Sequence, residues 1–152
     1  MLAAAAGSGW RVEVEWGGEG EARGSGSWQV PHRAPAYEIA WSPFGPADTL
    51  AAIEHAVAIY GIPYSLLHCT VKGESAGTFE PGIVGDNGHS FGVAQLYDRG
   101  QLPRFQGFYG LVGEYGEPTW ANPYYEVDYM AWYWWRYGEA SFFSQWNAAC
   151  WE

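Results

Sequence analysis

The sequence predicts a mainly helical α+β domain with a small β-hairpin flap and an N-terminal, glycine-rich β arm. Helices are predicted because apolar residues recur at helical spacing from residue 46 onward and because glycine or proline bounds these stretches. The β elements are predicted from period-two alternation near the N-terminus and from an Asn-Gly step at Asn87. With 152 residues, the chain is long enough for one domain with a buried core.

The N-terminal arm and a proline-rich linker are predicted to occupy residues 1–45, ahead of the helical domain at residues 46–152. Residues 10–16 (WRVEVEW) alternate as a strand does, and residues 27–30 (SWQV) could return as its partner. An isolated hairpin is marginally stable in water, so we expect the arm to dock on its own domain or on a neighbouring subunit. Four prolines make residues 31–46 a stiff, extended linker.

Four helices are predicted in the domain, and the sequence marks the ends of three of them. The first runs from residue 46 to residue 60, where Gly61 supplies the C-terminal stop. Pro63 opens the second helix, and Gly77 ends it. The last helix begins at Asn122 with proline at its first position, and it stops near residue 138.

Glu74 continues the apolar stripe that Leu67 and Val71 form on the second helix. A carboxylate on a buried stripe is costly unless it is paired or protonated. Desolvation raises its pKa, which is what a general acid working near neutral pH requires. The alternative is a capping or salt-bridged glutamate, although Lys72 lies on the wrong face of the helix to pair with it.

The segment after Glu74 predicts a flap. Asp86-Asn87-Gly88 separates two short predicted strands, 83–84 and 90–91, which would pair as a hairpin over the end of the helix. Gly92 would let the backbone approach a ligand or a packed helix closely. Gln95, expected early in a following helix, can donate and accept hydrogen bonds, which suits hydroxyl and acetamido groups.

Three runs resemble the lysozyme-like superfamily: YGIPYSLL at residues 60–67, ESAGTFEP at 74–81 and GDNGHSFGVAQ at 85–95. The chain is most similar to soluble lytic transglycosylases, goose-type lysozymes and phage virion lysins over roughly residues 47–137. The resemblance implies a glycosidase that cleaves the β-1,4 bond between N-acetylmuramic acid and N-acetylglucosamine in peptidoglycan. It also implies that Glu74 is the catalytic acid and that Ser75 and Gln95 orient the acid and the substrate.

The sequence departs from that family near its end. The transglycosylases carry an Ala-Tyr-Asn-Ala-Gly motif, whereas this chain has SQWNAACW at residues 144–151. Both outcomes, transglycosylation to an anhydro sugar and hydrolysis as in a muramidase, therefore stay open. An inverting hydrolase needs a second carboxylate about 6.5–9.5 Å from the first. Asp86 is the candidate, followed by Asp98, and the alternative role of Asp86 is that of a turn residue.

Aromatic residues make up 18% of the chain, and they fill a core, a subunit interface or a sugar-binding groove. A glycine- and aromatic-rich loop is predicted over residues 101–115, where it would form one wall of the groove. In the last helix, Asp128 and Tyr129 are polar side chains that could face the cleft, while core packing is the alternative. The candidate substrate-binding residues are Ser75, Ser90, Gln95, Tyr97, Phe108 and Tyr109.

Several other classes of site are disfavoured. Gly73-Glu74-Ser75-Ala76-Gly77 fits the Gly-x-Ser-x-Gly nucleophile elbow, but that motif needs a strand before the serine, and here a helix precedes it. The histidines and cysteines lack metal-ligand spacing, and no phosphate loop or dinucleotide motif occurs, so we expect no metal and no cofactor. A net charge of −10 with only seven Lys and Arg residues disfavours nucleic-acid and membrane partners.

The expected location is a virion, the periplasm or the extracellular space. No stretch reaches the roughly 18 apolar residues of a membrane span, and residues 1–6 do not resemble a secretory leader. The arm favours a phage tail or virion component that contacts other virion proteins and opens the wall locally. The alternative is a structural virion protein that keeps the fold without turnover. Cys69 and Cys150 could pair or remain free thiols.

Overall fold

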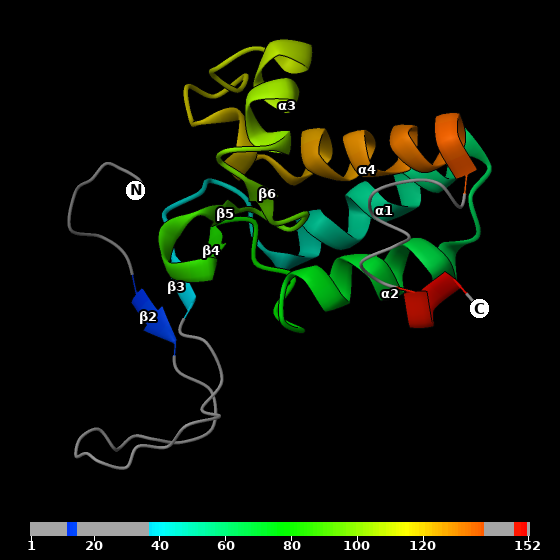
Figure 1. Cartoon of the computed structure of the whole chain (residues 1–152), viewed down its shortest axis with the longest axis horizontal. Helices are drawn as coiled ribbons and strands as arrows, with labels where there is room; N and C mark the ends of the chain where they lie inside the picture. The colour runs from blue at the N-terminus through cyan, green and yellow to red at the C-terminus, as the bar shows by residue number, and fades with distance from the viewer. Residues whose placement is uncertain (1–11, 15–36, 139–147, 152) are drawn as a thin grey trace.

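The computed structural model describes residues 12–14, 37–138 and 148–151. These residues form four α-helices and a five-stranded antiparallel sheet, which confirms the predicted mainly helical α+β class. Helices α1 (Pro46–Tyr60), α2 (Tyr64–Glu74) and α4 (Pro123–Tyr137) lie side by side, and the sheet lies at one end of this layer (Figure 1). Helix α3 (Gln101–Tyr109) stands at the same end, next to the start of α4 (Figure 1).

The helix boundaries follow from local sequence. Helix α1 starts where the carboxylate of Asp48 accepts a hydrogen bond from the Gly45 N–H at 2.9 Å, and it stops at Gly61, whose φ is 69°. Helix α4 starts where Oδ1 of Asn122 accepts from the Tyr124 N–H at 2.9 Å. It ends before Gly138. These boundaries confirm the predicted starts and stops of the first and last helices.

The sheet has the strand order β2-β3-β4-β5-β6. The hairpin predicted around the Asn-Gly step is confirmed, because Val84 pairs with Phe91 across a turn that contains the short 3-10 helix η3 (Asp86–Gly88). Strand β2 lies within the run predicted as a strand, while residues 27–30 lie outside the described residues. Strand β3 comes from the predicted linker segment and pairs with β4. The strands are β2 (Val12–Val14), β3 (Tyr37–Ile39), β4 (Ile83–Gly85), β5 (Ser90–Phe91) and β6 (Leu96–Tyr97).

In two segments after the hairpin, the predicted type of secondary structure was wrong. The step from Gly92 to Gln95 does not enter a helix, because the Gln95 N–H returns to the Gly92 carbonyl at 3.0 Å and the chain continues as β6. The first part of the predicted loop at residues 101–115 is helix α3. Leu102 and Phe105, three residues apart, bury one face of α3 in the core. Tertiary packing therefore stabilises a helix in a glycine-rich sequence that had predicted a loop.

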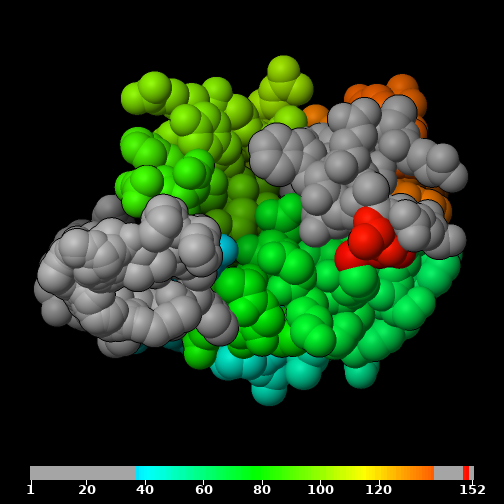
Figure 2. Space-filling model, turned by 60° about the horizontal axis from the view of Figure 1, so that its bottom comes forward, coloured from blue at the N-terminus to red at the C-terminus, as the bar shows by residue number. Residues whose placement is uncertain are grey.

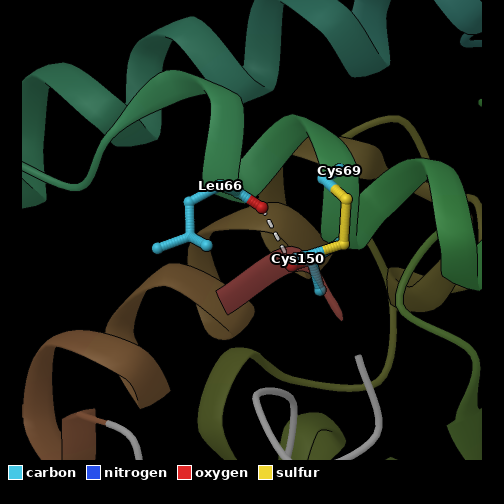
Figure 3. The surroundings of a disulfide bond; sticks show 4 residues. Leu66, Cys69 and Cys150 are labelled. Carbon is cyan, nitrogen blue, oxygen red and sulfur yellow. Dashed lines mark hydrogen bonds between the residues drawn. A yellow bond between two sulfur atoms is a disulfide. The ribbon is translucent and has the colours of Figure 1, made fainter. Parts of the chain in front are cut away.

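The core lies between the three layered helices and extends to the sheet. Ile53 of α1, Leu67 of α2 and Met130 of α4 are each fully buried there. Cys69 of α2 forms a disulfide with Cys150 of the short 3-10 helix η6 (Ala148–Trp151), which ties the C-terminal end of the chain to α2 (Figure 3).

Among the described residues, no helix combines the length and the apolar character needed to cross a membrane.

Candidate functional site

A pocket of about 870 Å³ lies where the end of α2, the β4–β5 hairpin and the start of α3 meet. Figure 2 shows the face on which the green surface of α2 meets the yellow-green surface of the segment leading into α3. The pocket brings together residues from α2, β3, the hairpin, β6 and α3. It is lined by Tyr37, Gly73, Glu74, Asp86, Asn87, Ser90, Ala94, Gln95, Tyr97, Gly100 and Gln101. Five of the eight predicted site residues therefore share one pocket.

Glu74 is the last residue of α2, and it lines this pocket. The helix ends one turn before the predicted stop at Gly77, because Ala76 has a φ of 55° and Gly77 has a φ of 79°. The buried stripe is present as predicted in Leu67 and Val71, which are completely buried. Glu74 itself is half-buried, because the stripe reaches the pocket at this point.

Tyr37 was missed by the sequence analysis, which placed it in a linker. Strand β3 carries it into the lining of the pocket that also holds Glu74. Burial raises the pKa of the Tyr37 phenol, and the charge of Glu74 raises that pKa further. A Cβ atom at Gly85 would lie 2.8 Å from Cε1 of Tyr37 and 2.4 Å from Oε1 of Gln95. Glycine at this strand end therefore lets both side chains reach the pocket.

Gln95 lines the pocket, but from a tight turn and not from a helix. Its backbone has a φ of 50°, a conformation that residues other than glycine rarely adopt. Its Nε2 donates to the Gly92 carbonyl at 3.0 Å and to the Ser90 carbonyl at 3.4 Å. The side-chain amide is thus fixed by the backbone of its own turn.

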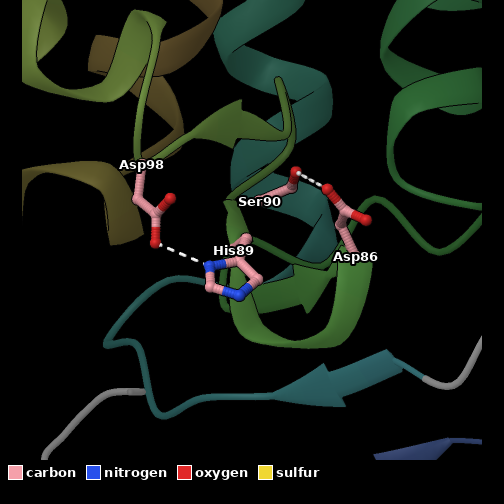
Figure 4. A network of polar contacts seen from close by, with 4 residues as sticks. All are labelled: Asp86, His89, Ser90 and Asp98. Atoms are coloured by element: carbon pink, nitrogen blue, oxygen red, sulfur yellow. Dashed lines mark hydrogen bonds and ion pairs between the residues drawn. The ribbon is translucent and has the colours of Figure 1, made fainter.

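Two side chains of the hairpin, those of Ser90 and His89, each pair with an aspartate (Figure 4). Ser90 Oγ donates to Oδ2 of Asp86 at 3.5 Å, and both residues line the pocket. Nδ1 of His89 lies 2.9 Å from Oδ2 of Asp98, and neither of these residues lines it. Of the two candidate second carboxylates, Asp86 is therefore the one in the pocket with Glu74. Its φ of 54° shows that it also serves in the turn.

The remaining predicted contacts lie elsewhere. Ser75 is completely buried, and its Oγ accepts a hydrogen bond from the Phe79 N–H at 3.1 Å, so it shapes the turn after α2. Phe108 and Tyr109 belong to α3 and do not line this pocket. The Tyr109 hydroxyl donates to Asp128, and Phe108 packs edge-on against Trp132. Asp128, which could have faced the cleft, thus bonds between helices instead.

Glu126 is a second acid that the sequence analysis missed. It is completely buried in α4, and its Oε1 accepts a hydrogen bond from the Ala94 N–H at 2.7 Å. Burial raises its pKa well above 4.5; the Ala94 hydrogen bond opposes this shift, and the charge of Glu74 adds to it. The helical spacing that singled out Glu74 could have found it, because Pro123, Glu126, Val127 and Met130 form one buried stripe.

Among the described residues that line the pocket, the charged ones are acidic: Glu74 and Asp86 contribute carboxylates, and no described lysine or arginine takes part. Such a lining favours a neutral or cationic ligand over an anionic one. Within the described residues, no group of three or more His, Cys, Asp or Glu side chains is placed to hold a metal ion.

Comparisons with protein-family models, with curated proteins and with solved structures found no match to this chain.

Proposed function

We propose that this chain is a lysozyme-like, peptidoglycan-cleaving glycosidase, either a lytic transglycosylase or a muramidase, with Glu74 as its general acid. The observation that carries the proposal is one pocket that gathers Glu74, Asp86 and Gln95 from α2, the hairpin turn and the turn before β6. Its volume of about 870 Å³ lies within the range of sites that hold small ligands.

The proposed reaction starts with Glu74. Its carboxylic acid would protonate the glycosidic oxygen between N-acetylmuramic acid and N-acetylglucosamine as the bond to the anomeric carbon breaks. The positive charge that develops on the sugar ring favours a site with carboxylates, and Glu74 and Asp86 supply two of them to this lining. Gln95 and Ser90 are the polar wall residues proposed to contact hydroxyl and acetamido groups.

The second step decides the product. In a hydrolysis, Asp86 would accept a proton from the attacking water on the opposite face of the sugar. In a transglycosylation, the 6-hydroxyl of the muramic acid would attack the anomeric carbon and give an anhydro end, while Glu74, now a carboxylate, accepts the hydroxyl proton. The proposed setting is a phage particle, in which the N-terminal segment contacts other virion proteins.

The test is mass spectrometry of the muropeptides released from purified peptidoglycan by the wild type and by Glu74→Gln. We expect release by the wild type and none by the variant, and the ends of the fragments, anhydro or reducing, identify the reaction. Asp98→Asn is the matched control, because Asp98 is a nearby carboxylate outside the pocket lining. No release by a folded wild type would overturn the proposal and favour a structural virion role.

A further inference from the structure

We propose that Glu126 is a positioning residue for this site: its carboxyl group holds the Gly92–Gln95 turn against α4 and thereby fixes Ala94 and Gln95 in the pocket wall. The inference rests on the proposed function for its effect on cleavage. The contacts that carry it do not depend on that function, and they can be tested separately.

The first contact is the hydrogen bond from the Ala94 N–H to Oε1 of Glu126, 2.7 Å long and completely buried. Ala94 lines the pocket, and Gln95 follows it directly. The bond joins residues 32 apart in sequence, and it adds a polar contact between the turn and α4 to the core that Val93 and Val127 share.

The second contact is steric. A Cβ atom at Gly92 would lie 2.4 Å from Oε1 of Glu126 and 2.5 Å from Oε2. The backbone of the turn therefore rests directly on the carboxyl group, in a place that only glycine can occupy, and Gly92 has a φ of 80°. At its other end, the Gly92 carbonyl accepts from Nε2 of Gln95 at 3.0 Å. Glu126 thus acts on the Gln95 side chain through one glycine.

The third observation concerns charge. Oε2 of Glu126 is buried without a hydrogen-bond partner among the described residues, a surrounding that favours a neutral carboxylic acid over a carboxylate. Glu74 is the charged group among these residues that acts on Glu126. Burial is the main reason why the pKa of Glu126 is raised, and the charge of Glu74 raises it further.

Two variants of Glu126 distinguish the effect of its hydrogen bond to Ala94 from the effect of its side-chain volume. Glu126→Gln mimics the neutral acid and keeps the acceptor for Ala94, so we expect kcat to stay within about threefold of wild type. Glu126→Leu fills a similar volume without an acceptor, and we expect kcat to fall roughly 10- to 100-fold as the pocket wall shifts. Asp128→Asn, which lies on the same helix but bonds elsewhere, is the matched control and should leave kcat unchanged.

A second readout needs no cleavage. In the wild type, the NMR signal of the Ala94 amide should titrate with a midpoint above 4.5, and in Glu126→Gln this step should be absent. The proposal is overturned if the NMR signal of the Ala94 amide changes neither with pH nor on substitution of Glu126. Equal losses of kcat in Glu126→Gln and Glu126→Leu would also overturn it. If the wild type does not cleave, the proposed function fails, and the amide titration still decides whether Glu126 holds the turn.

Discussion

The Tyr60 hydroxyl donates a hydrogen bond to Oδ1 of Asp128 across 2.9 Å. Oδ2 of the same carboxylate accepts from the Tyr109 hydroxyl, so one acid on α4 joins α1 and α3. Burial raises the pKa of Tyr60 to about 12, together with the hydrogen bond to Asp128 and its charge. Asp128 and Glu126 are two residues apart on one helix, yet one bonds between helices and the other supports a pocket wall.

Replacement of Asp128 by alanine should lower the free energy of unfolding by about 1–3 kcal/mol, because it leaves two tyrosine hydroxyls without their acceptor. The pKa of Tyr60 should fall toward 10 in the same variant. Urea denaturation and ultraviolet titration of the phenols measure the two effects. Glu54→Ala, on the exposed face of α1, is the control and should change stability by less than about 0.5 kcal/mol. An equal loss in both variants would contradict the assigned role.

Gly92→Ala and Gly88→Ala form a second comparison. Both glycines have positive φ, 80° and 92°, so both variants incur backbone strain of about 1–2 kcal/mol. Only the Cβ at position 92 would also collide with Glu126, whereas position 88 has open space. Gly92→Ala should therefore destabilise the fold by at least about 1 kcal/mol more than Gly88→Ala. In a double-mutant cycle, Gly92→Ala should destabilise the fold less when Glu126 is already alanine. If the effects of the two substitutions on the free energy of unfolding simply add, the contact is contradicted.

Local chemistry allowed part of this fold to be predicted. Asn122 followed by proline fixed the start of α4, and the Asn-Gly step at residue 87 indicated the hairpin, because capping and turn geometry depend on a few adjacent residues. The pairing of β4 with β3 could not be predicted, because more than 40 residues of chain separate the two strands. Tyr37 was missed as a pocket residue for that reason.

The candidate site was predictable to a similar extent. Glu74 stood out because its spacing from Leu67 and Val71 placed it on a buried stripe. Glu126 lies on an equally clear stripe, but the aromatic residues around it concealed the pattern. Helix α3 was missed because its proline, its glycine and its aromatic residues have weak helical preference, and burial of Leu102 and Phe105 in the assembled core stabilises it.

The stability of the wild type should depend on pH through Glu126. Below about 4.5 the group is protonated in both the folded and the unfolded chain. As pH rises, the unfolded chain releases this proton first, so stability falls until the pH passes the raised pKa of the folded state. Glu126→Gln lacks this titration. The Tm of Glu126→Gln should therefore rise relative to the Tm of the wild type between pH 4.5 and pH 7. Calorimetry at several pH values measures this difference, and a difference that does not change with pH would contradict the prediction.

Ser75→Ala should affect the fold more than the reaction. The variant removes the acceptor of the partly buried Phe79 N–H, so the free energy of unfolding should fall by about 1 kcal/mol. The kcat for peptidoglycan cleavage should stay within about threefold of wild type, because Ser75 is completely buried and does not line the pocket. Denaturant titration and muropeptide release measure the two quantities. A loss of turnover without a loss of stability would show that Ser75 acts in catalysis.

The Cys69–Cys150 bond should stabilise the fold by about 2–5 kcal/mol, since it constrains a long loop in the unfolded chain. Cys150→Ser should lose this amount in guanidinium denaturation. Reductant should produce the same loss in the wild type and no further loss in the variant. Equal stability of the oxidised wild type and the variant would contradict the prediction.

The same bond turns most of the domain into a covalent ring. The ring runs from α2 to η6 and, of the described residues that line the pocket, contains all except Tyr37. A protease that nicks the hairpin or any other single site between the two cysteines therefore releases no fragment. The two pieces stay joined through sulphur, and the cut is visible on a gel only after reduction.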